Sequence, residues 1–412
     1  MVLFPSFFNG LARTVSSTSS SLKKAKSLEK DSAAAAAAAD GGGKLAAEEL
    51  AKDAKRNELI LSSSGIVKST KSNNFASVCS RRGQKGVNQD CLVVWEEFGC
   101  QEDMTFCGVF DGHGPWGHVV AKRVRESVPP SLLCNWQKTL QSSLDVEMEL
   151  GLVNENEDLL LRHSNQQHRF EIWKESYLKT YAAVDQQLKQ LHPKIDTFFS
   201  GTTALTIVKQ RNHLIIANVG DSRAVLATTS DNGTLSAVQL TVDFKPNLPQ
   251  EAERIKNSRG RVFCLQDEPG VYRVWRPSGK TPGLAISRAF GDYSIKEYGL
   301  ISVPEVTQLS VTSRDRFVIL ASDGVWDVVS NQEAVRIVAA AAAASGGREK
   351  CARRLVEYAG RAWKRKRGGV AMDDMSAICL FFHEVEAEAE AASPAATDGG
   401  GVGREKNGKC LD

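Results

Sequence analysis

Residues 106–114 of this chain read FCGVFDGHG, a short apolar run that stops at an acid, a glycine and a histidine. Such a run, bounded by turn residues, predicts a buried strand. Its last residue, Asp111, would then present a carboxylate at the edge of a sheet. Residues 316–324, RFVILASDG, repeat the pattern and place Asp323 at the end of a second predicted strand.

Two other apolar runs carry the acid at the opposite end. Asp90 directly precedes residues 91–95, CLVVW, and the pair Asp373 and Asp374 precedes residues 376–382, SAICLFF. In an antiparallel sheet the start of one strand lies at the same edge as the end of its neighbour. We therefore expect four acids from distant parts of the chain to converge on one place.

The composition is typical of a soluble globular protein. Of the 412 residues, 42% are hydrophobic and 25% are charged, and the length has room for one large domain or two ordinary ones. A net charge of +3 is too small to indicate nucleic-acid binding by itself. No apolar run approaches the roughly 18 to 20 residues that cross a bilayer. The nine cysteines include no C-x-x-C pair, which argues against a disulfide framework or a thiolate zinc site and favours a reducing compartment.

Both ends of the chain differ in composition from its middle. We expect residues 1–74, rich in Ser, Ala and Gly, and residues 385–412 to be disordered, because they bury too little apolar surface to offset the entropy of ordering. The folded domain is then expected over residues 75–384. The first 27 residues carry four basic residues and no acid. We interpret them as a basic disordered tail, with an organellar transit peptide as the second interpretation, and Val2 excludes the myristoylation pattern.

Helix and strand patterns occur in separate blocks along the middle of the chain. Apolar residues spaced by three and four predict a helix over residues 170–191, and we interpret its aromatic stripe as core. Short apolar runs at 203–208, 214–219 and 224–228 predict an antiparallel meander. Blocks rather than alternation favour an α+β fold of antiparallel layers over a doubly wound sheet.

Four segments complete the predicted organisation. Ser330 and Glu333 form a capping-box pattern that opens a helix, and residues 349–367 predict another helix with a strongly basic end. Residues 259–282 are rich in Gly, Pro and Arg with little periodicity, which indicates a long surface loop or flap. Residues 145–158 are acidic and are interpreted as a surface insertion.

Four carboxylates that meet in a partly buried cleft repel one another, and a divalent cation is the usual remedy. With oxygen ligands and no clustered His or Cys, the pattern favours Mg²⁺ or Mn²⁺ over Zn²⁺ or Cu²⁺. Gly112 leaves its carbonyl free to approach an ion. Two ions roughly 3.5 to 4 Å apart could bridge a water and generate a hydroxide that attacks phosphorus. His113, two residues past Asp111, is a candidate general acid for the departing alkoxide.

Seven short motifs follow one another along the chain: KGVNQD at 85–90, VFDGHG at 109–114, SGTTA at 200–204, NVGDSRA at 218–224, LAISRAFGD at 284–292, ASDGVWD at 321–327 and DDMS at 373–376. In this order they resemble the metal-dependent type 2C serine/threonine protein phosphatases, and most closely a plant member. The resemblance covers residues 75–384, some three-quarters of the chain.

The resemblance implies an α-β-β-α sandwich of two antiparallel sheets flanked by helices. It implies hydrolysis of phosphoserine and phosphothreonine on proteins, with two Mg²⁺ or Mn²⁺ ions per active site. Carried over by motif, the metal ligands would be Asp90, Asp111, Asp323, Asp373 and, through its carbonyl, Gly112. Asp373 rather than Asp374 takes this role because the family motif is an Asp followed by Asn or Asp before the final strand. His113 would be the general acid, and Lys85 aligns with the phosphate-binding arginine of many members.

The chain departs from the family pattern at three places. Gln89 stands where many members have an acid before the first metal-binding Asp, so one ligand oxygen would come from elsewhere or from water. Lys85 supplies charge to a phosphate but not the bidentate fork of an arginine. An Asp that helps to hold a third ion in some members is replaced by Phe198, with Asp196 two residues further back, which puts a third metal in doubt.

Other polar residues in these motifs have a structural interpretation. Asp221, Arg223 and Asp292 are expected to form turns and hydrogen bonds that bridge the sheets rather than to take part directly in catalysis. The run KRKR at 364–367 would end a solvated helix or act as a nuclear address, and a nucleic-acid-binding role is the weaker alternative.

The leading prediction is an active phosphatase, and the alternative is a phosphatase-like scaffold that has lost its chemistry. An inactive relative usually lacks one of the acids, whereas all four are present here. The expected partners are phosphorylated protein substrates, with no nucleic acid and no membrane, and the chain is expected to be a monomer. The expected compartment is the cytosol or the nucleus.

Overall fold

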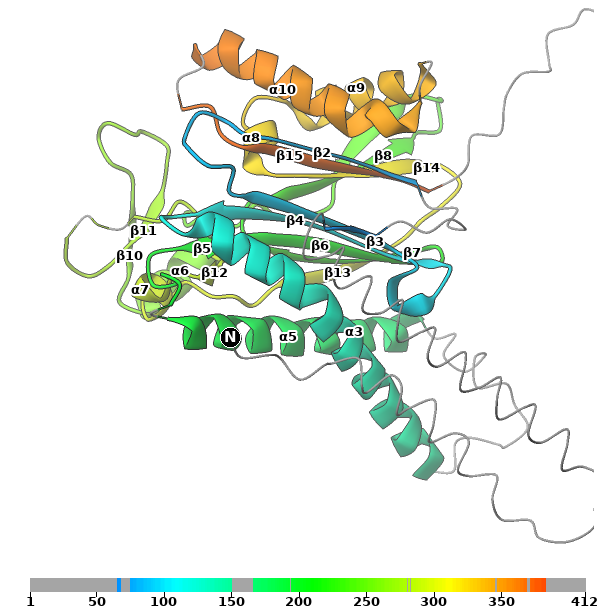
Figure 1. Cartoon of the computed structure of the whole chain (residues 1–412), viewed down its shortest axis with the longest axis horizontal. Coiled ribbons are helices and arrows are strands. Elements are labelled where there is room, and N and C mark those ends of the chain that lie inside the picture. The colour runs from blue at the N-terminus through cyan, green and yellow to red at the C-terminus, as the bar shows by residue number, and fades with distance from the viewer. Residues whose placement is uncertain are drawn as a thin grey trace, which may run out of the picture.

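The structure, a computed structural model, describes residues 65–67, 75–149, 166–192, 194–279, 281, 283–344, 347–368 and 371–382 (Figure 1). Its strands are β1 (Ile66–Val67), β2 (Phe75–Arg81), β3 (Asp90–Glu96), β4 (Met104–His113), β5 (Gly201–Thr202), β6 (Ala204–Gln210), β7 (His213–Val219), β8 (Arg223–Thr229), β9 (Leu235–Gln239), β10 (Arg261–Phe263), β11 (Arg273–Trp275), β12 (Phe290–Gly291), β13 (Glu305–Ser310), β14 (Asp315–Ala321) and β15 (Met375–Phe381). Its helices are α3 (Gly117–Glu149), α5 (Gln166–Leu191), α6 (Pro249–Asn257), α7 (Tyr293–Lys296), α8 (Asp323–Trp326), α9 (Asn331–Ala343) and α10 (Cys351–Arg367), with short 3₁₀ turns η1 (Phe98–Cys100) and η2 (Arg348–Lys350).

Two stacked sheets form the centre of the molecule, and helices cover both outer faces (Figure 1). One sheet has the strand order β1-β3-β4-β6-β7-β13, with β5 and β12 attached at β4, and the other has the order β2-β15-β14-β8-β9. Every pairing between the described strands is antiparallel except that of β1 with β3. The predicted α-β-β-α sandwich of antiparallel sheets is confirmed.

The central strands, such as β4 and β14, bury both of their faces, which explains why they read as nearly continuous apolar runs. In β4, Cys107 and Val109 point into the cluster between the two sheets, whereas Phe106 and Phe110 point to the helical layer. The strand β14 alternates in the same way, with Val318 among the residues between the sheets. Two cores therefore lie on either side of each central strand, and this fixes the strand register because a one-residue slip would exchange the faces.

The helices α3 and α5 pack together on the outer face of the first sheet. The stripe predicted for residues 170–191 is buried, and Trp173 of α5 stacks on Trp136 of α3 with ring centroids 4.9 Å apart. The stripe is therefore core, as predicted. On the second sheet, α9 begins with the predicted capping box, in which Ser330 accepts from the Glu333 amide, and α10 packs beside it.

Three sequence predictions differ from the structure. The predicted meander does not continue through its third strand, because β8 pairs with β14 and β9 of the second sheet and not with β7. The acidic stretch 145–158 is not wholly an insertion, because α3 continues through Glu149; the remainder of it lies outside the described residues. The expected boundary at residue 75 leaves out β1, where buried Val67 adds to the edge of β3. Most of the expected disordered segments 1–74 and 385–412 also lies outside the described residues.

The expected flap at residues 259–282 is more ordered than the sequence indicated. Its strands β10 and β11 pair in antiparallel register, and the indole of Trp275 is buried against Phe263 at a centroid distance of 4.9 Å. Two strands of three residues are too short to show a period, so the composition of the connecting residues dominated the prediction.

None of the helices in the described ranges combines the length and the apolar content that crossing a bilayer would require.

Candidate active site

The register of the first sheet brings two of the predicted acids together. Asp90, the first residue of β3, pairs directly with Asp111, near the end of β4. The two side chains therefore leave the sheet from adjacent strands at the same edge. Gly112 follows on β4 and pairs with Thr202 of β5.

The second sheet brings the other two acids to the same end of the molecule. The strands β14 and β15 pair at Ala321 and Ala377, so Asp323, which opens α8, and Asp373, which precedes β15, lie at one edge. Across the sandwich, the hydroxyl of Ser322 donates to Asp90 Oδ2 at 2.8 Å. The structure thus assembles all four acids in one place; their role as metal ligands stays a prediction.

The surroundings of the carboxyl groups at this edge disfavour their charged forms. Burial raises the pKa of Asp90 to about 7. Burial and the charges of Asp90 and Asp323 hold the pKa of Asp111 well above its ordinary range. Burial together with Asp221 and Asp373 does the same to the pKa of Asp323. Negative charge is therefore costly here, and a cation among these groups would relieve the cost.

The donor set fits a hard divalent cation. Oδ1 of Asp90 and Oδ1 of Asp323 are buried and have no hydrogen-bond partner among the described residues, although buried carboxylate oxygens are normally satisfied. A side chain at Gly112 would come within 2.4 Å of the Gly117 carbonyl oxygen, so only glycine allows the backbone to pass. Carboxylate and carbonyl oxygens are the ligands that Mg²⁺ and Mn²⁺ prefer.

The carboxylates do not yet form a finished cage. Within the described ranges, no three acid, histidine or cysteine side chains stand close enough together to hold an ion. Asp373 is instead paired with Lys85, whose Nζ lies 2.5 Å from Asp373 Oδ2. Burial alone would lower the pKa of Lys85, but the hydrogen bond and charge of Asp373 outweigh it and raise the pKa. The side chains would therefore have to draw together around a metal.

Asp373 and Asp374 make different contacts, and the choice between them as a ligand stays a prediction. Asp374 is buried, and its two oxygens accept from the amides of Gly83 and Gln89 at 2.7 and 2.8 Å. It therefore holds the loop that carries Lys85. Asp373 has a side chain that is 28% exposed and faces Lys85.

The residues at which the chain departs from the family pattern have other contacts. The side-chain amide of Gln89 donates to the Gly114 carbonyl at 3.0 Å, which ties β3 to the loop after His113. Asp196 accepts from the amides of Phe198 and Phe199, both at 3.1 Å, and so closes a turn. Phe198 itself is 37% exposed. Neither Asp196 nor Phe198 reaches the four acids through any contact that the structure shows.

His113 is held by a residue 179 positions away. Its Nε2 lies 2.6 Å from Asp292 Oδ2. Burial would lower the pKa of His113, but the charge and hydrogen bond of Asp292 outweigh it and raise the pKa. A side chain at Gly201 would come within 2.0 Å of Asp292 Oδ2 and 2.7 Å of His113 Nε2, so glycine is required beside this pair.

The contact between His113 and Asp292 is a feature of the candidate site that the sequence did not predict. Asp292 was expected to form turns, and it does have a left-handed backbone with φ of 52° and an amide that donates to Ser200. Its carboxylate nevertheless orients the imidazole. The available signal was its place in the SRAFGD motif, but that motif does not say which histidine it meets.

A second group of charged residues lies beside the four acids. Lys245 forms an ion pair with buried Asp221, and its charge also acts on Asp323. Arg223 donates to Asp243 and to Asn331, as expected for a residue that bridges elements. The role of Lys245 was not predicted, since nothing in DFKP at 243–246 was recognised as a motif.

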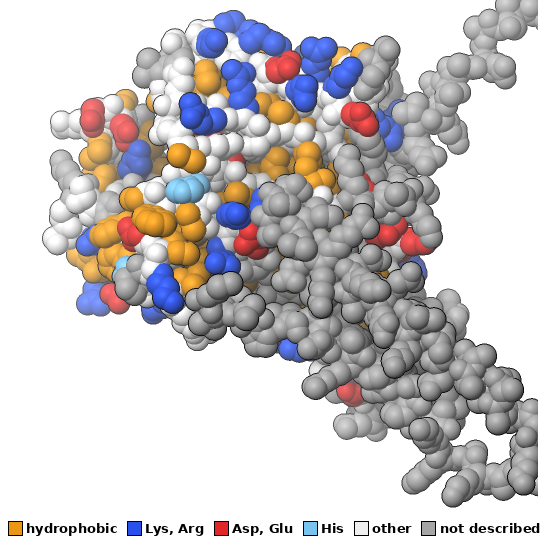
Figure 2. Space-filling view, viewed as in Figure 1, with side chains coloured by type: hydrophobic (Ala, Val, Ile, Leu, Met, Phe, Trp, Pro, Cys, Tyr) orange, Lys and Arg blue, Asp and Glu red, His pale blue; other side chains and the backbone are white. Residues whose placement is uncertain are grey.

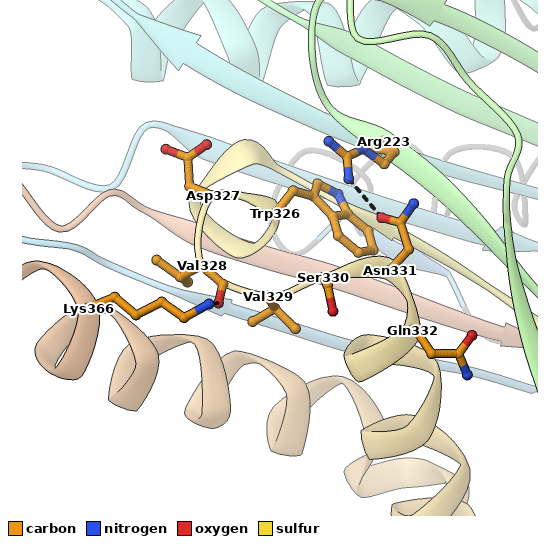
Figure 3. A pocket seen from close by; sticks show the side chains of 9 residues that line it. All are labelled: Arg223, Trp326, Asp327, Val328, Val329, Ser330, Asn331, Gln332 and Lys366. Carbon is orange, nitrogen blue, oxygen red and sulfur yellow. Dashed lines mark hydrogen bonds between the residues drawn. The ribbon is translucent and has the colours of Figure 1, made fainter. Parts of the chain in front are cut away.

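A pocket of about 560 Å³ lies beside α8, separate from the four acids (Figure 3). Its two cations are already bonded: Arg223 to Asn331, and Lys366 to the Val328 carbonyl at 2.8 Å. Trp326 lies under Arg223, whose Cζ is 5.3 Å from the ring centroid. We interpret this pocket as a junction between α8, α9 and α10.

The basic end of α10 lies on the outer face of the second helical layer, where Figure 2 shows lysine and arginine side chains. Lys364 and Arg365 are exposed, as expected for the end of a solvated helix.

Comparison with known proteins agrees with the architecture. A family model described as Protein phosphatase 2C matches residues 74–366 of the chain. This chain belongs to the protein phosphatase 2C family. Family membership makes it a protein phosphatase, and phosphatases of this family are generally metal-dependent.

Its plant relatives within the 2C family align over most of their length. "Probable protein phosphatase 2C 73" of Arabidopsis thaliana is 61% identical over 380 residues, which cover 92% of this chain and 94% of the relative. "Probable protein phosphatase 2C 48" of Oryza sativa subsp. japonica is 57% identical over 328 residues, covering 79% and 88%. The crystal structure of a serine-threonine phosphatase 2C from Toxoplasma gondii has a TM-score of 0.64 and 26% identity, covering 76% of this phosphatase and 97% of that chain.

Proposed function

We propose that this phosphatase hydrolyses phosphoserine and phosphothreonine on proteins with the help of two Mg²⁺ or Mn²⁺ ions. The observation that carries the proposal is the meeting of four acids at one edge. The pKa values of Asp90, Asp111 and Asp323 are raised, and one buried oxygen each of Asp90 and Asp323 has no hydrogen-bond partner among the described residues. The residues that would hold the ions are Asp90, Asp111, Gly112, Asp323 and Asp373. When bound, the ions would supply the positive charge that activates water and binds phosphate.

Two basic side chains of the chain itself would act on the phosphorylated residue. Lys85 lies at the cleft beside Asp373 and would place an ammonium group against the phosphate oxygens as a point charge. Transfer of Lys85 from Asp373 to the phosphate would free that carboxylate for a cation. The same loop position is fixed by Asp374, so the lysine approaches from a defined direction.

His113 would donate the proton that the departing serine or threonine oxygen needs. Asp292 holds the ring through Nε2 and favours its protonated form, which is the form that a general acid requires. The second ring nitrogen, Nδ1, would then be the one that donates the proton to the departing oxygen. This arrangement resembles other sites in which a carboxylate orients a catalytic imidazole.

The alternative, an inactive scaffold, has less support. A scaffold would have no need to keep four mutually repelling acids, a lysine and an oriented histidine at one edge. The number of ions is proposed as two, because Asp196 is engaged in a turn and Phe198 offers no ligand for a third.

We propose that the chain acts as a monomer in the cytosol or nucleus. A fluorescent fusion confined to an organelle would contradict this compartment.

Release of phosphate from a phosphothreonine peptide tests the proposal. With Mn²⁺ present we expect turnover, and excess EDTA should abolish it until Mn²⁺ is restored. A protein that is folded by circular dichroism but inactive with Mn²⁺ or Mg²⁺ would support the scaffold. Turnover that EDTA does not change would contradict the metal mechanism.

A further inference from the structure

Three large aromatic side chains are exposed beside the proposed active site. Trp116 is 43% exposed, Phe198 37% and Phe199 44%. We call these three residues the aromatic shelf. Figure 2 shows hydrophobic side chains gathered on this end of the molecule, over β5 and α7. Exposed aromatic residues that gather in one place indicate a binding surface, whereas single exposed residues need no explanation.

The shelf is rigid. The amides of Phe198 and Phe199 both donate to Asp196, and the Phe198 carbonyl accepts from the Ser294 amide at 3.0 Å. The two phenyl rings meet edge to face with centroids 4.9 Å apart. The aromatic side chains are therefore held at the surface by a fixed backbone, and a partner that covers them would not have to order a loop.

The shelf adjoins the segment that follows His113. The Trp116 amide donates to Ser200 Oγ at 2.9 Å, and Ser200 directly follows Phe199. A side chain at Gly114 would come within 2.2 Å of the Phe199 carbonyl oxygen, so the two backbones are in direct contact. Trp116 is three residues from His113, which limits the distance between their Cα atoms to roughly 11 Å. An extended peptide covers that distance in about three residues.

The guanidinium group of Arg276 lies over the shelf. The Cζ atom of Arg276 is 5.8 Å from the ring centroid of Phe199, within the range of a cation–π contact. Its Nε is buried and has no hydrogen-bond partner among the described residues. Its backbone carbonyl accepts from Arg261 at 2.9 Å, which fixes this end of the hairpin formed by β10 and β11. Arg276 as a whole is only half-buried, so a carboxylate, the acceptor that an arginine binds best, could reach the exposed part of its guanidinium group.

We propose that the aromatic shelf and Arg276 select phosphoprotein segments that carry a large apolar residue and an acidic residue within about three positions of the phosphorylated residue. This inference rests on the proposed function, because it names the sequence around the phosphate that the same site removes. The apolar side chain packs on Phe199 and Trp116, and the carboxylate pairs with Arg276. Some family members have an acid at the position of Phe198 that holds a further ion. In this chain Phe198 would instead contact the protein substrate.

Two phosphothreonine peptides test the apolar half. They are identical except that leucine residues within three positions on both sides of the phosphothreonine are replaced by alanine. The readout is kcat/KM relative to that for para-nitrophenyl phosphate, which reports the metal site without a peptide. We expect the wild type to prefer the leucine peptide about tenfold, at the lower end of what an apolar pocket contributes, and Phe199→Ala to reduce the preference to less than threefold.

The control is Leu178→Ala, which removes an exposed apolar side chain of α5 outside the shelf. This variant should keep the tenfold preference and the wild-type rate on para-nitrophenyl phosphate. Phe199→Leu should restore part of the preference. Equal kcat/KM for the two peptides in the wild type, or a preference that survives in both Phe199→Ala and Trp116→Ala, would overturn the shelf.

A second pair of peptides, with glutamate or glutamine near the phosphothreonine, tests Arg276. The wild type should prefer the glutamate peptide several-fold at low salt and less at high salt, and Arg276→Gln should remove the preference, whereas Arg353→Gln on exposed α10 should keep it. No preference in the wild type would overturn the role of Arg276. If the wild type had no activity on either peptide or on para-nitrophenyl phosphate, the proposed function itself would be contradicted. The two failures are therefore distinguishable.

Discussion

At the scale of single residues, the site depends on pairs that come from distant parts of the sequence. Asp90 and Asp111 are register partners on neighbouring strands, whereas Asp323 joins them across the sandwich. Burial and neighbouring carboxylates raise the pKa values of Asp90, Asp111 and Asp323, so the charged form of each is more costly alone than in the presence of a cation. Removal of one of these carboxylates should therefore weaken metal binding but leave the metal-free protein as stable as before or more stable.

The first prediction concerns Asp111→Asn. The variant should lose at least about tenfold in kcat with Mn²⁺, a barrier change of about 1.4 kcal/mol or more. The metal-free variant should unfold at the same temperature as the wild type or higher, because a repelling carboxyl has been removed. Thermal unfolding in EDTA and phosphate release from a phosphopeptide measure the two effects. A variant that keeps more than a tenth of the wild-type kcat would show that Asp111 is not a ligand.

The second prediction concerns the pair His113 and Asp292. His113→Ala should reduce kcat on a phosphoprotein more than on para-nitrophenyl phosphate, because a good leaving group needs no proton. Asp292→Asn should reproduce the same imbalance in weaker form. The double variant should be no slower than His113→Ala, since the two residues act as one unit. Additive losses, or equal losses on both substrates, would exclude a general acid oriented by Asp292.

At the scale of elements, α6 connects the hairpin of β10 and β11 to the main body. Its Glu251 is buried and accepts from Arg254 at 2.6 Å, from Arg288 at 2.8 Å and from Ser287 at 2.6 Å. Arg288 also lies 3.7 Å from the ring centroid of Phe244. Both arginines would lose their shared acceptor charge if Glu251 became neutral. The stability of this part of the molecule therefore depends on one carboxylate.

The third prediction follows from that contact. Glu251→Gln should lower the free energy of unfolding by roughly 3 kcal/mol, as expected when one partner of a buried ion pair is removed. Glu253→Gln changes an exposed glutamate of the same helix and should have little effect. Urea unfolding of the two variants measures the difference. Equal midpoints for both variants would contradict the structural role of Glu251.

The fourth prediction gives the pH range of this contribution. Burial alone would raise the pKa of Glu251, but hydrogen bonds from Arg254, Arg288 and Ser287 lower it from 4.5 to about 2. A folded-state pKa below the unfolded value means that the stabilisation is present above about pH 4.5 and is lost as the pH falls toward 2. The stability difference between wild type and Glu251→Gln should therefore narrow over that range. A difference that stays constant down to pH 2 would contradict the lowered pKa.

The elements also show which parts of the fold the sequence predicts. The stripe on α5 and the capping box of α9 are local patterns, and both were found correctly. The helix α3 was missed because Pro129 and Pro130 interrupt it, although Val120, Val124 and Val128 are buried at the helical spacing. Proline is a strong local signal against a helix, and tertiary packing against the first sheet overrides it here.

At the scale of the whole molecule, two sheets must stack in one register for the acids to meet. Ser322 bridges them through its bond to Asp90, and the cluster between the sheets contains residues from both. The convergence could be predicted because strand starts and strand ends share an edge. The pairs of Lys85 with Asp373 and of His113 with Asp292 could not, because side-chain contacts between distant loops leave no periodic signal in the sequence.

The most direct test of the central claim is an anomalous scattering experiment at the manganese absorption edge, on crystals grown with Mn²⁺. We expect two anomalous peaks enclosed by Asp90, Asp111, Asp323 and Asp373, one of them within coordination distance of the Gly112 carbonyl, with Lys85 displaced from Asp373. No peak among these four carboxylates at millimolar Mn²⁺, or peaks bound only elsewhere on the chain, would contradict the account.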